Sequence, residues 1–178
     1  MPLPAHGKGP LAPESVVDGA EQSGNKNPVS VLVVVHTQAL DVMLLERAAH
    51  PGYWQSVTGS QEGDESLIDT ARRELQEETG IVALADQLHD WRLSNRYEIF
   101  AEWRHRYPAG VTHNVEHVFS LCLPTTLAIT IEPEEHLASR WLPWREAASA
   151  CFSWTNHDAI LMLGLGGIKR ACAAHKPP

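Results

Sequence analysis

The segment from residue 59 to residue 81 constrains the fold of this chain most, because it joins a glycine-rich loop to a capped helix. Its apolar residues recur at helical intervals, at Ile68, Ala71 and Leu75. Ser66 with Asp69 three positions later resembles a capping box, and Gly80 stands where a glycine commonly ends a helix. The sequence therefore predicts a helix over residues 66–78.

Three glutamates of this helix project to one side. Glu74, Glu77 and Glu78 lie at i, i+3 and i+4, within an arc of about 100°. At about 5 Å and an effective dielectric near ~20, each pair of carboxylates repels by roughly 3 kcal/mol. A divalent cation reverses this repulsion, since carboxylate oxygens are the ligands that Mg²⁺ prefers. The alternative interpretation, which three glutamates alone would favour, is a solvated acidic helix face.

The residues around the glutamates favour the metal site. The segment 59–81 has the sequence GSQEGDESLIDTARRELQEETGI. It matches the Nudix signature at each defining position: Gly, five residues, Glu, seven residues, Arg-Glu, an aliphatic residue, any residue, Glu-Glu, any residue, Gly and an aliphatic residue. The chain thus resembles the Nudix hydrolase family, and the resemblance implies an enzyme that cuts a diphosphate linkage with Mg²⁺, or with Mn²⁺ in its place.

The resemblance also implies roles for individual residues. The expected catalytic set is Arg73, Glu74, Glu77 and Glu78. The expected metal ligands are Glu74 and Glu78, a further contribution from Glu77, the Gly59 carbonyl, and Glu135 from a distant part of the chain. Glu134 competes with Glu135 for that last position. Glu65 and Arg73 are expected to brace the loop against the helix, and Gly80 to end the helix. The identity of the general base stays open.

Segments outside the motif resemble one branch of the family, the dihydroneopterin triphosphate diphosphatases of folate biosynthesis. They are KNPVSVLVVV, WQSVTGS, YEIF, RHRYPAGVTHN, EHLASRWL and FSWTNHDAI. The resemblance implies hydrolysis of 7,8-dihydroneopterin 3'-triphosphate to the monophosphate and pyrophosphate. Two alternatives are hydrolysis of a nucleoside triphosphate such as dATP, or of another nucleoside diphosphate-linked compound, and a ligand-sensing module without catalysis. All acids of the motif are present, which favours an enzyme.

The same resemblance implies a set of substrate contacts. They are Lys26, Arg47, Thr58, Tyr97, Glu98, Ile99, Phe100 and Ser153, with residues 97–100 forming a wall for the pterin. A basic cluster also surrounds this wall in sequence, consisting of Arg92, Arg96, Arg104, His105 and Arg106. Such a cluster suits a bound triphosphate. The alternative for each of its members is an ordinary surface cation that covers apolar surface with its stem.

The hydrophobic pattern predicts a mixed α/β domain. VSVLVVVHT, from Val29, is continuous and β-branched, as in a strand buried on both faces, and VMLLER is its expected hairpin partner. Further strands are expected at about 88–100, 111–123 and 137–142, and one or two short helices from Trp144 to Leu163. The resemblance implies the Nudix fold, an α/β/α sandwich with a mixed sheet, over residues 28–165. Residues 1–27 and 166–178 are expected to form tails, the first of them flexible.

Charge and composition exclude several classes of partner. The net charge of −8 should repel nucleic acid and anionic membranes, so a polyanionic substrate needs a local basic patch or a cation. No stretch approaches the ~18 apolar residues of a membrane helix. The three cysteines are odd in number and contain no C-x-x-C pair, so no disulfide framework is expected and a cytoplasmic location is predicted. The oligomeric state is left open.

One further pattern, H-x-x-E-H at residues 113–117, resembles a zinc-binding motif. The surrounding THNVEHVFSLCL predicts a strand, in which residues four apart are about 13 Å apart and cannot share a zinc ion. We therefore expect no zinc there, and Glu116 stays a minor candidate for the metal or base role.

Overall fold

The computed structural model describes residues 26–167, so the expected N-terminal tail up to residue 25 and the C-terminal tail from residue 168 lie outside it. In chain order the elements are β1 (Val29–Thr37), β2 (Asp41–Arg47), β3 (Trp54–Gln55), β4 (Val57–Ser60), α1 (Leu67–Thr79), η1 (Ala85–Gln87), β5 (Leu88–Glu98), η2 (Ala101–Arg106), β6 (His113–Leu123), β7 (His136–Pro143), α2 (Trp144–Ala150) and α3 (Trp154–Gly164).

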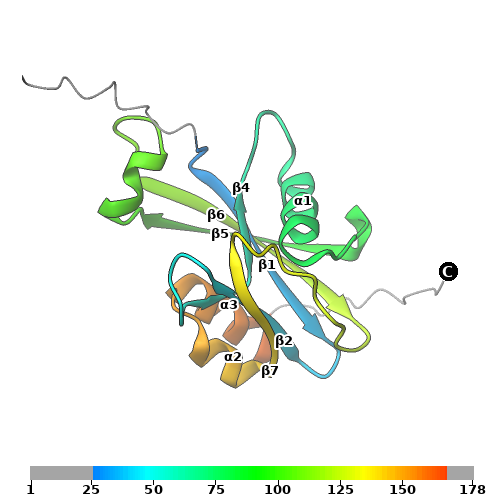
Figure 1. The fold of residues 1–178 in the computed structure, drawn as a ribbon. Coiled ribbons are helices and arrows are strands. Elements are labelled where there is room, and N and C mark those ends of the chain that lie inside the picture. Colours follow the sequence, from blue (N-terminus) through cyan, green and yellow to red (C-terminus); the bar gives the residue numbers. More distant parts are fainter. Residues whose placement is uncertain (1–25, 168–178) are drawn as a thin grey trace, which may run out of the picture.

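The strands form one mixed sheet with β1 at its centre (Figure 1). The order is β3-β2-β1-β6-β5, with β4 also paired to β1 and β7 to β2. β1 runs antiparallel to β2, which confirms the expected hairpin, and parallel to β6, some eighty residues later in the chain. The parallel pairing lets two distant segments share one sheet face along their whole length.

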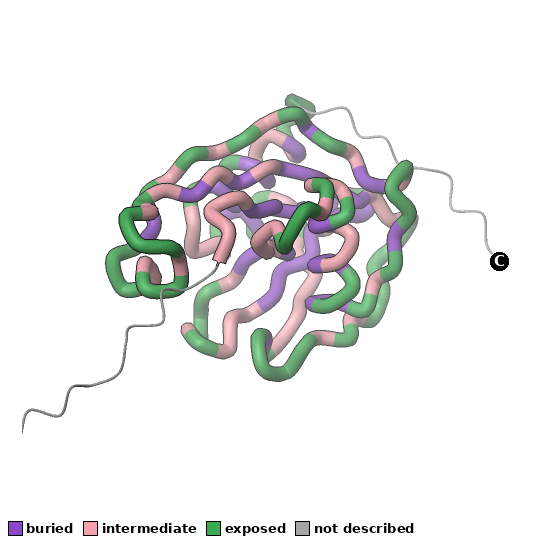
Figure 2. Tube along the Cα trace, turned by 90° about the horizontal axis from the view of Figure 1, so that it is seen from above, coloured by how far each residue is buried: buried purple, intermediate pink, exposed green. Residues whose placement is uncertain are grey.

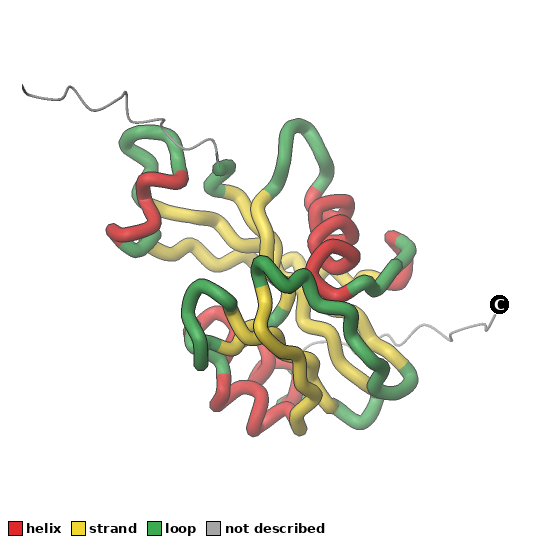
Figure 3. The backbone as a smooth tube through the Cα atoms, viewed as in Figure 1, coloured by secondary structure: helices red, strands yellow, loops and turns green. Residues whose placement is uncertain are grey.

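Helices cover both faces of the sheet, and the expected three-layer α/β/α arrangement is confirmed (Figures 1 and 3). Alternate residues of a strand point to opposite faces. Val31 and Val33 of β1 accordingly pack in the core beneath α1, whereas Leu32 packs with Ile160 of α3 on the other face. Figure 2 shows this buried backbone in the middle of the molecule, with exposed loops around it. Burial on both faces explains why β1 has a continuous apolar sequence.

Helix α1 has the predicted ends. The Ser66 side chain caps the helix by accepting a hydrogen bond from the Asp69 N–H, and Gly80 adopts the left-handed conformation, with φ of 72°. The resemblance to a capping box is only partial, because the Asp69 carboxylate accepts from the Ser66 hydroxyl, at 2.6 Å, instead of from a backbone N–H. The short polar side chain of Ser66 thus fixes where α1 begins, and Gly80 fixes where it stops.

The sequence predicted neither a membrane-spanning helix nor a disulfide framework. Among the helices of residues 26–167, none is both long and apolar enough to cross a membrane. Cys151 is a free thiol, but Cys122 is disulfide-bonded. The expectation that the cysteines would form no disulfide is therefore wrong for Cys122, because a residue count says nothing of which thiols the fold brings together.

Candidate active site

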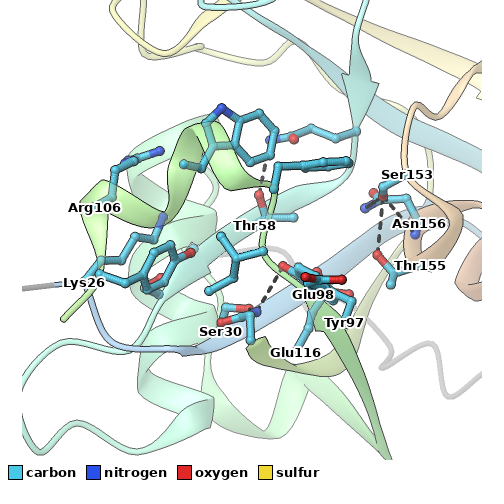
Figure 4. A pocket seen from close by; sticks show the side chains of 18 of the residues that line it. Lys26, Ser30, Thr58, Tyr97, Glu98, Arg106, Glu116, Ser153, Thr155 and Asn156 are labelled. Carbon is cyan, nitrogen blue, oxygen red and sulfur yellow. Dashed lines mark hydrogen bonds between the residues drawn. The ribbon is translucent and has the colours of Figure 1, made fainter. Parts of the chain in front are cut away.

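A cavity of about 670 Å³ opens beside β4, between the loop around η2 and the start of α3. Its walls come from β1, β4, β5, β6, η2 and the N-terminal end of α3. Figure 4 shows Lys26 and Arg106 on one side of the cavity, Ser153 and Thr155 on the opposite side, and Thr58 between them. Residues that are far apart in the sequence therefore face one open cavity.

The acids of α1 press against β4, which forms one wall of this cavity. A Cβ atom added to Gly59 would lie 1.7 Å from Cδ of Glu74, so only glycine leaves room for that carboxylate. The Thr58 backbone N–H donates to Oε2 of Glu78 at 3.3 Å. Burial raises the pKa of Glu74 to about 7 against the opposing charge of Arg73, and it raises the pKa of Glu78 as well. Two desolvated carboxylates thus lie directly behind β4.

Arg73 connects the loop to the helix. Its guanidinium donates to Glu65 at 2.8 Å, to Glu74 at 2.8 Å, to Glu77 at 3.0 Å and to the Ser60 carbonyl at 2.9 Å. The hydrogen bond from Arg73 lowers the pKa of Glu65 to about 2. These contacts have the geometry of a brace between loop and helix, and they hold Glu74 and Glu77 in ion pairs with Arg73.

Glu78 belongs to a second group of ligand-type side chains. One ligand atom each from Glu78, Glu135 and His136 lie within 4.8 Å of one another. His136 is buried, and within the described chain neither of its ring nitrogens has a hydrogen-bond partner; Nε2 lies 3.5 Å from Oε2 of Glu78, longer than a well-formed bond. Glu134 is absent from this group. Carboxylate oxygens and an unpaired imidazole fit a divalent cation, and this group places Glu135, expected there from the family resemblance, next to Glu78 of α1.

His136 is the residue that sequence reasoning missed in this group. The available signal was its position directly after Glu135, in EEHL. Of the expected ligands, Glu78 and Glu135 come together here, whereas Glu74 and Glu77 bind Arg73. The carbonyl of Gly59 belongs to β4, the strand that packs against Glu74 and Glu78 of α1.

Besides Arg104, which is paired with Glu98, three cations line the cavity: Lys26, Arg47 and Arg106. Burial lowers the pKa of Lys26 and of Arg47, and the charge of Arg106 lowers both further, which places the three within electrostatic reach of one another. The negative charges of Glu74 and Glu135 raise the pKa of Lys26 and so partly offset these effects. The basic side of the cavity therefore lies within electrostatic reach of Glu74 and Glu135, which are outside its lining.

Only part of the predicted basic cluster reaches this cavity. Arg104 and Arg106 line it, while Arg92, Arg96 and His105 are exposed elsewhere and fit the surface interpretation. Arg104 forms an ion pair with Glu98. Arg106 is therefore the member of the cluster whose charge stays directed at the cavity and its neighbouring cations.

The remaining predicted substrate contacts all line the cavity: Thr58, Tyr97, Glu98, Ile99, Phe100 and Ser153. The Tyr97 hydroxyl accepts from Asn114 at 3.0 Å, and Ile99 is buried, whereas Phe100 is largely exposed. Ser153 caps α3. Sequence reasoning missed two aromatic neighbours, Trp103 and Phe152, whose rings lie 5.3 and 5.9 Å from the Arg47 guanidinium.

The H-x-x-E-H segment lies in β6, as its pattern predicted. Its histidines are therefore spread along a strand, and among the described residues they are not part of any group that could hold a metal. Glu116, between them, is buried and lines the cavity away from Glu78 and Glu135.

Comparison with known proteins gives a consistent result. The NUDIX domain matches residues 26–162. The dihydroneopterin triphosphate diphosphatase of Escherichia coli K12 is 44% identical over 138 residues, which cover 76% of this chain and 91% of that protein. The enzyme of the same name from Haemophilus influenzae is 39% identical over 138 residues, covering 76% and 86%. The solved structure of the E. coli dihydroneopterin triphosphate pyrophosphohydrolase has a TM-score of 0.74 at 42% identity, covering 80% of this chain and 99% of that one.

Proposed function

This chain belongs to the NUDIX family of hydrolases, and from that membership we propose that it cleaves dihydroneopterin triphosphate to dihydroneopterin monophosphate and pyrophosphate. Its likeness to the E. coli and H. influenzae enzymes covers most of each of those chains. The observation that carries the proposal is a cavity with four basic side chains and a partly aromatic wall, next to the acids of α1 that pack behind its wall strand β4. A planar ring with a triphosphate tail needs all three. The cytoplasmic location expected from the sequence stays part of this proposal.

We propose Mg²⁺ as the cofactor, with Glu78 and Glu135 as ligands and with Glu74, Glu77 and the Gly59 carbonyl completing the set. Support comes from the oxygen-rich donor groups, which suit a hard cation. When bound, such a cation neutralises phosphate oxygens and lowers the pKa of a bound water. Lys26, Arg47 and Arg106 bind the other phosphate oxygens, and Arg73 holds the acidic helix against its loop. Catalysis of this kind is mostly positioning and charge stabilisation.

The decisive experiment measures pyrophosphate release from dihydroneopterin triphosphate, dATP and GTP by the purified chain, with Mg²⁺ and after treatment with EDTA. We expect the highest kcat/KM for the pterin and loss of turnover without the metal, restored by Mg²⁺ or Mn²⁺. A kcat/KM for dATP far above that for the pterin would replace the proposed substrate by the nucleotide alternative. Absence of turnover with every triphosphate would support a ligand-sensing module instead.

The Glu78→Gln variant tests the proposed metal site. Glutamine has the same shape and can still accept from the Thr58 N–H, so the fold should survive, while a negative ligand is lost. We expect kcat to fall at least about 100-fold and Mn²⁺ affinity, followed by electron paramagnetic resonance, to fall with it. Glu146→Gln, the same change on the exposed face of α2, is the control. Unchanged turnover and Mn²⁺ affinity in Glu78→Gln would remove Glu78 from the site.

A further inference from the structure

Glu116 is a buried acid that the proposed chemistry does not use. It lies in β6 with 3% of its surface exposed, and it is one of the residues that line the cavity (Figure 4). In the sheet it is the register partner of Ser30 in β1 and of Asn95 in β5. Register partners present their side chains on the same face. Glu116 is therefore at the centre of a polar floor formed by three adjacent strands.

The carboxylate of Glu116 is incompletely neutralised. Its neighbours are the Asn95 amide, at 3.5 Å, and the Thr155 hydroxyl. No Lys or Arg within residues 26–167 forms an ion pair with it, and burial raises its pKa. A carboxylate can accept about four hydrogen bonds, and a desolvated one costs free energy until it has donors. Two neutral neighbours orient Glu116 and leave it with accepting capacity for a ligand.

Asn114 adds a second acceptor to the same floor. It lies two residues before Glu116 in β6, so both side chains point to one face. Its amide nitrogen donates to the Ser30 hydroxyl at 2.7 Å and to the Tyr97 hydroxyl at 3.0 Å. Its Oδ1 is buried and has no hydrogen-bond partner in the described chain. The floor of the cavity therefore presents acceptors, and a ligand that fits it must supply N–H donors.

We propose that Glu116 recognises the 2-amino-4-oxopyrimidine edge of the substrate ring by accepting hydrogen bonds from the ring N–H and the exocyclic amino group. The inference rests on the proposed function, and it names the part of the substrate that this site selects. Two adjacent, nearly parallel N–H donors match the two oxygens of a carboxylate, as in other bidentate pairs. Guanine has the same edge, whereas adenine presents one donor and one acceptor there, and hypoxanthine lacks the amino group.

Glu98 is the other acid in the cavity wall, and its surroundings differ. Its side chain is 67% exposed and is paired with Arg104. A carboxylate that is solvated and already paired gains little from further donors, whereas the buried Glu116 gains much. The contrast assigns recognition of the ring edge to Glu116.

The test compares Glu116→Gln with the wild-type enzyme on dihydroneopterin triphosphate, GTP and ITP. Glutamine keeps the shape, but its amide N–H₂ group faces the donors of the ligand, and one charge-assisted contact is lost. We expect kcat/KM for dihydroneopterin triphosphate and for GTP to fall by about 10- to 100-fold, mainly through KM. We expect the wild type to prefer GTP over ITP and the variant to show no such preference. Glu146→Gln, on the exposed face of α2, should match the wild type.

The outcomes separate this inference from the proposed function. Failure of the wild type to cleave dihydroneopterin triphosphate overturns the proposed function, whereas an active wild type with an equally active Glu116→Gln overturns only the role of Glu116. Circular dichroism and thermal melting establish whether the variant folds. If the variant does not fold, the test is made on the wild type instead, by comparing how strongly GTP and ITP inhibit its turnover of dihydroneopterin triphosphate. Stronger inhibition by GTP supports recognition of the amino group, and the absence of a difference between GTP and ITP overturns it.

Discussion

At the scale of single residues, Gly59 leaves no room for a side chain. A methyl group at this position would overlap Cδ of Glu74, at 1.7 Å. We predict that Gly59→Ala displaces the Glu74 carboxylate and lowers kcat at least about 100-fold, a loss typical of a misplaced catalytic group. Steady-state kinetics together with thermal melting would measure both effects.

The control for Gly59→Ala is Gly52→Ala. Gly52 has a φ of 89° and no heavy atom within 4 Å of an added Cβ, so alanine there strains the backbone without touching the site. It should cost about 1 kcal/mol of stability and leave kcat unchanged. If Gly59→Ala loses no more activity than Gly52→Ala, the close approach of Gly59 to Glu74 has no functional meaning.

At the scale of elements, the ion pair between Glu65 and Arg73 holds the loop against α1. Both side chains are partly buried, and the hydrogen bond lowers the pKa of Glu65 from 4.5 to about 2. A lowered pKa in the folded state means that the carboxylate stabilises the protein above about pH 4.5 and that this contribution is lost as the pH falls towards 2. The brace should therefore make stability depend on pH within this window.

We predict that Glu65→Gln lowers the free energy of unfolding at pH 7 by about 1–2 kcal/mol, reduced from the full shift by partial solvent screening. The difference from the wild type should shrink as the pH falls from about 4.5 to 2. Urea unfolding at several pH values measures it. Glu62→Gln is the matched control, since Glu62 lies 3.9 Å from Arg73 with a 75% exposed side chain. A difference between Glu65→Gln and the wild type that is constant with pH would contradict the assignment.

At the scale of the whole molecule, an acidic protein binds a polyanion only through local positive charge. The net charge is −8, while Lys26, Arg47 and Arg106 face one cavity. We predict that Arg106→Gln raises KM for dihydroneopterin triphosphate about fivefold to tenfold through loss of a charge-assisted phosphate contact, with kcat within about twofold. Arg96→Gln, an exposed change of the same charge outside the cavity, should leave KM unaltered. Equal effects of both changes would mean that the overall charge, and not the position of Arg106, governs binding.

The sequence by itself determined the local structure and the class of chemistry. The ends of α1, the buried strand β1 and the spacing of the glutamates depend on residues within one or two turns of each other, and periodicity records such short-range constraints. The strand assignment of residues 113–117 also followed from local pattern and is confirmed by β6.

Only the tertiary structure decided which distant residues meet. The parallel pairing of β1 with β6 brings Glu116 beside Ser30, and the start of β7 brings His136 to Glu78, where the sequence had indicated only its neighbour Glu135 and only through the family resemblance. The same folding directs Arg106 into the cavity and leaves Arg96 on the surface, although both belong to one basic stretch of sequence. These contacts depend on strand order and on packing across the sheet. Both are set by residues that are far apart in the chain, so no local periodicity of the sequence indicates them.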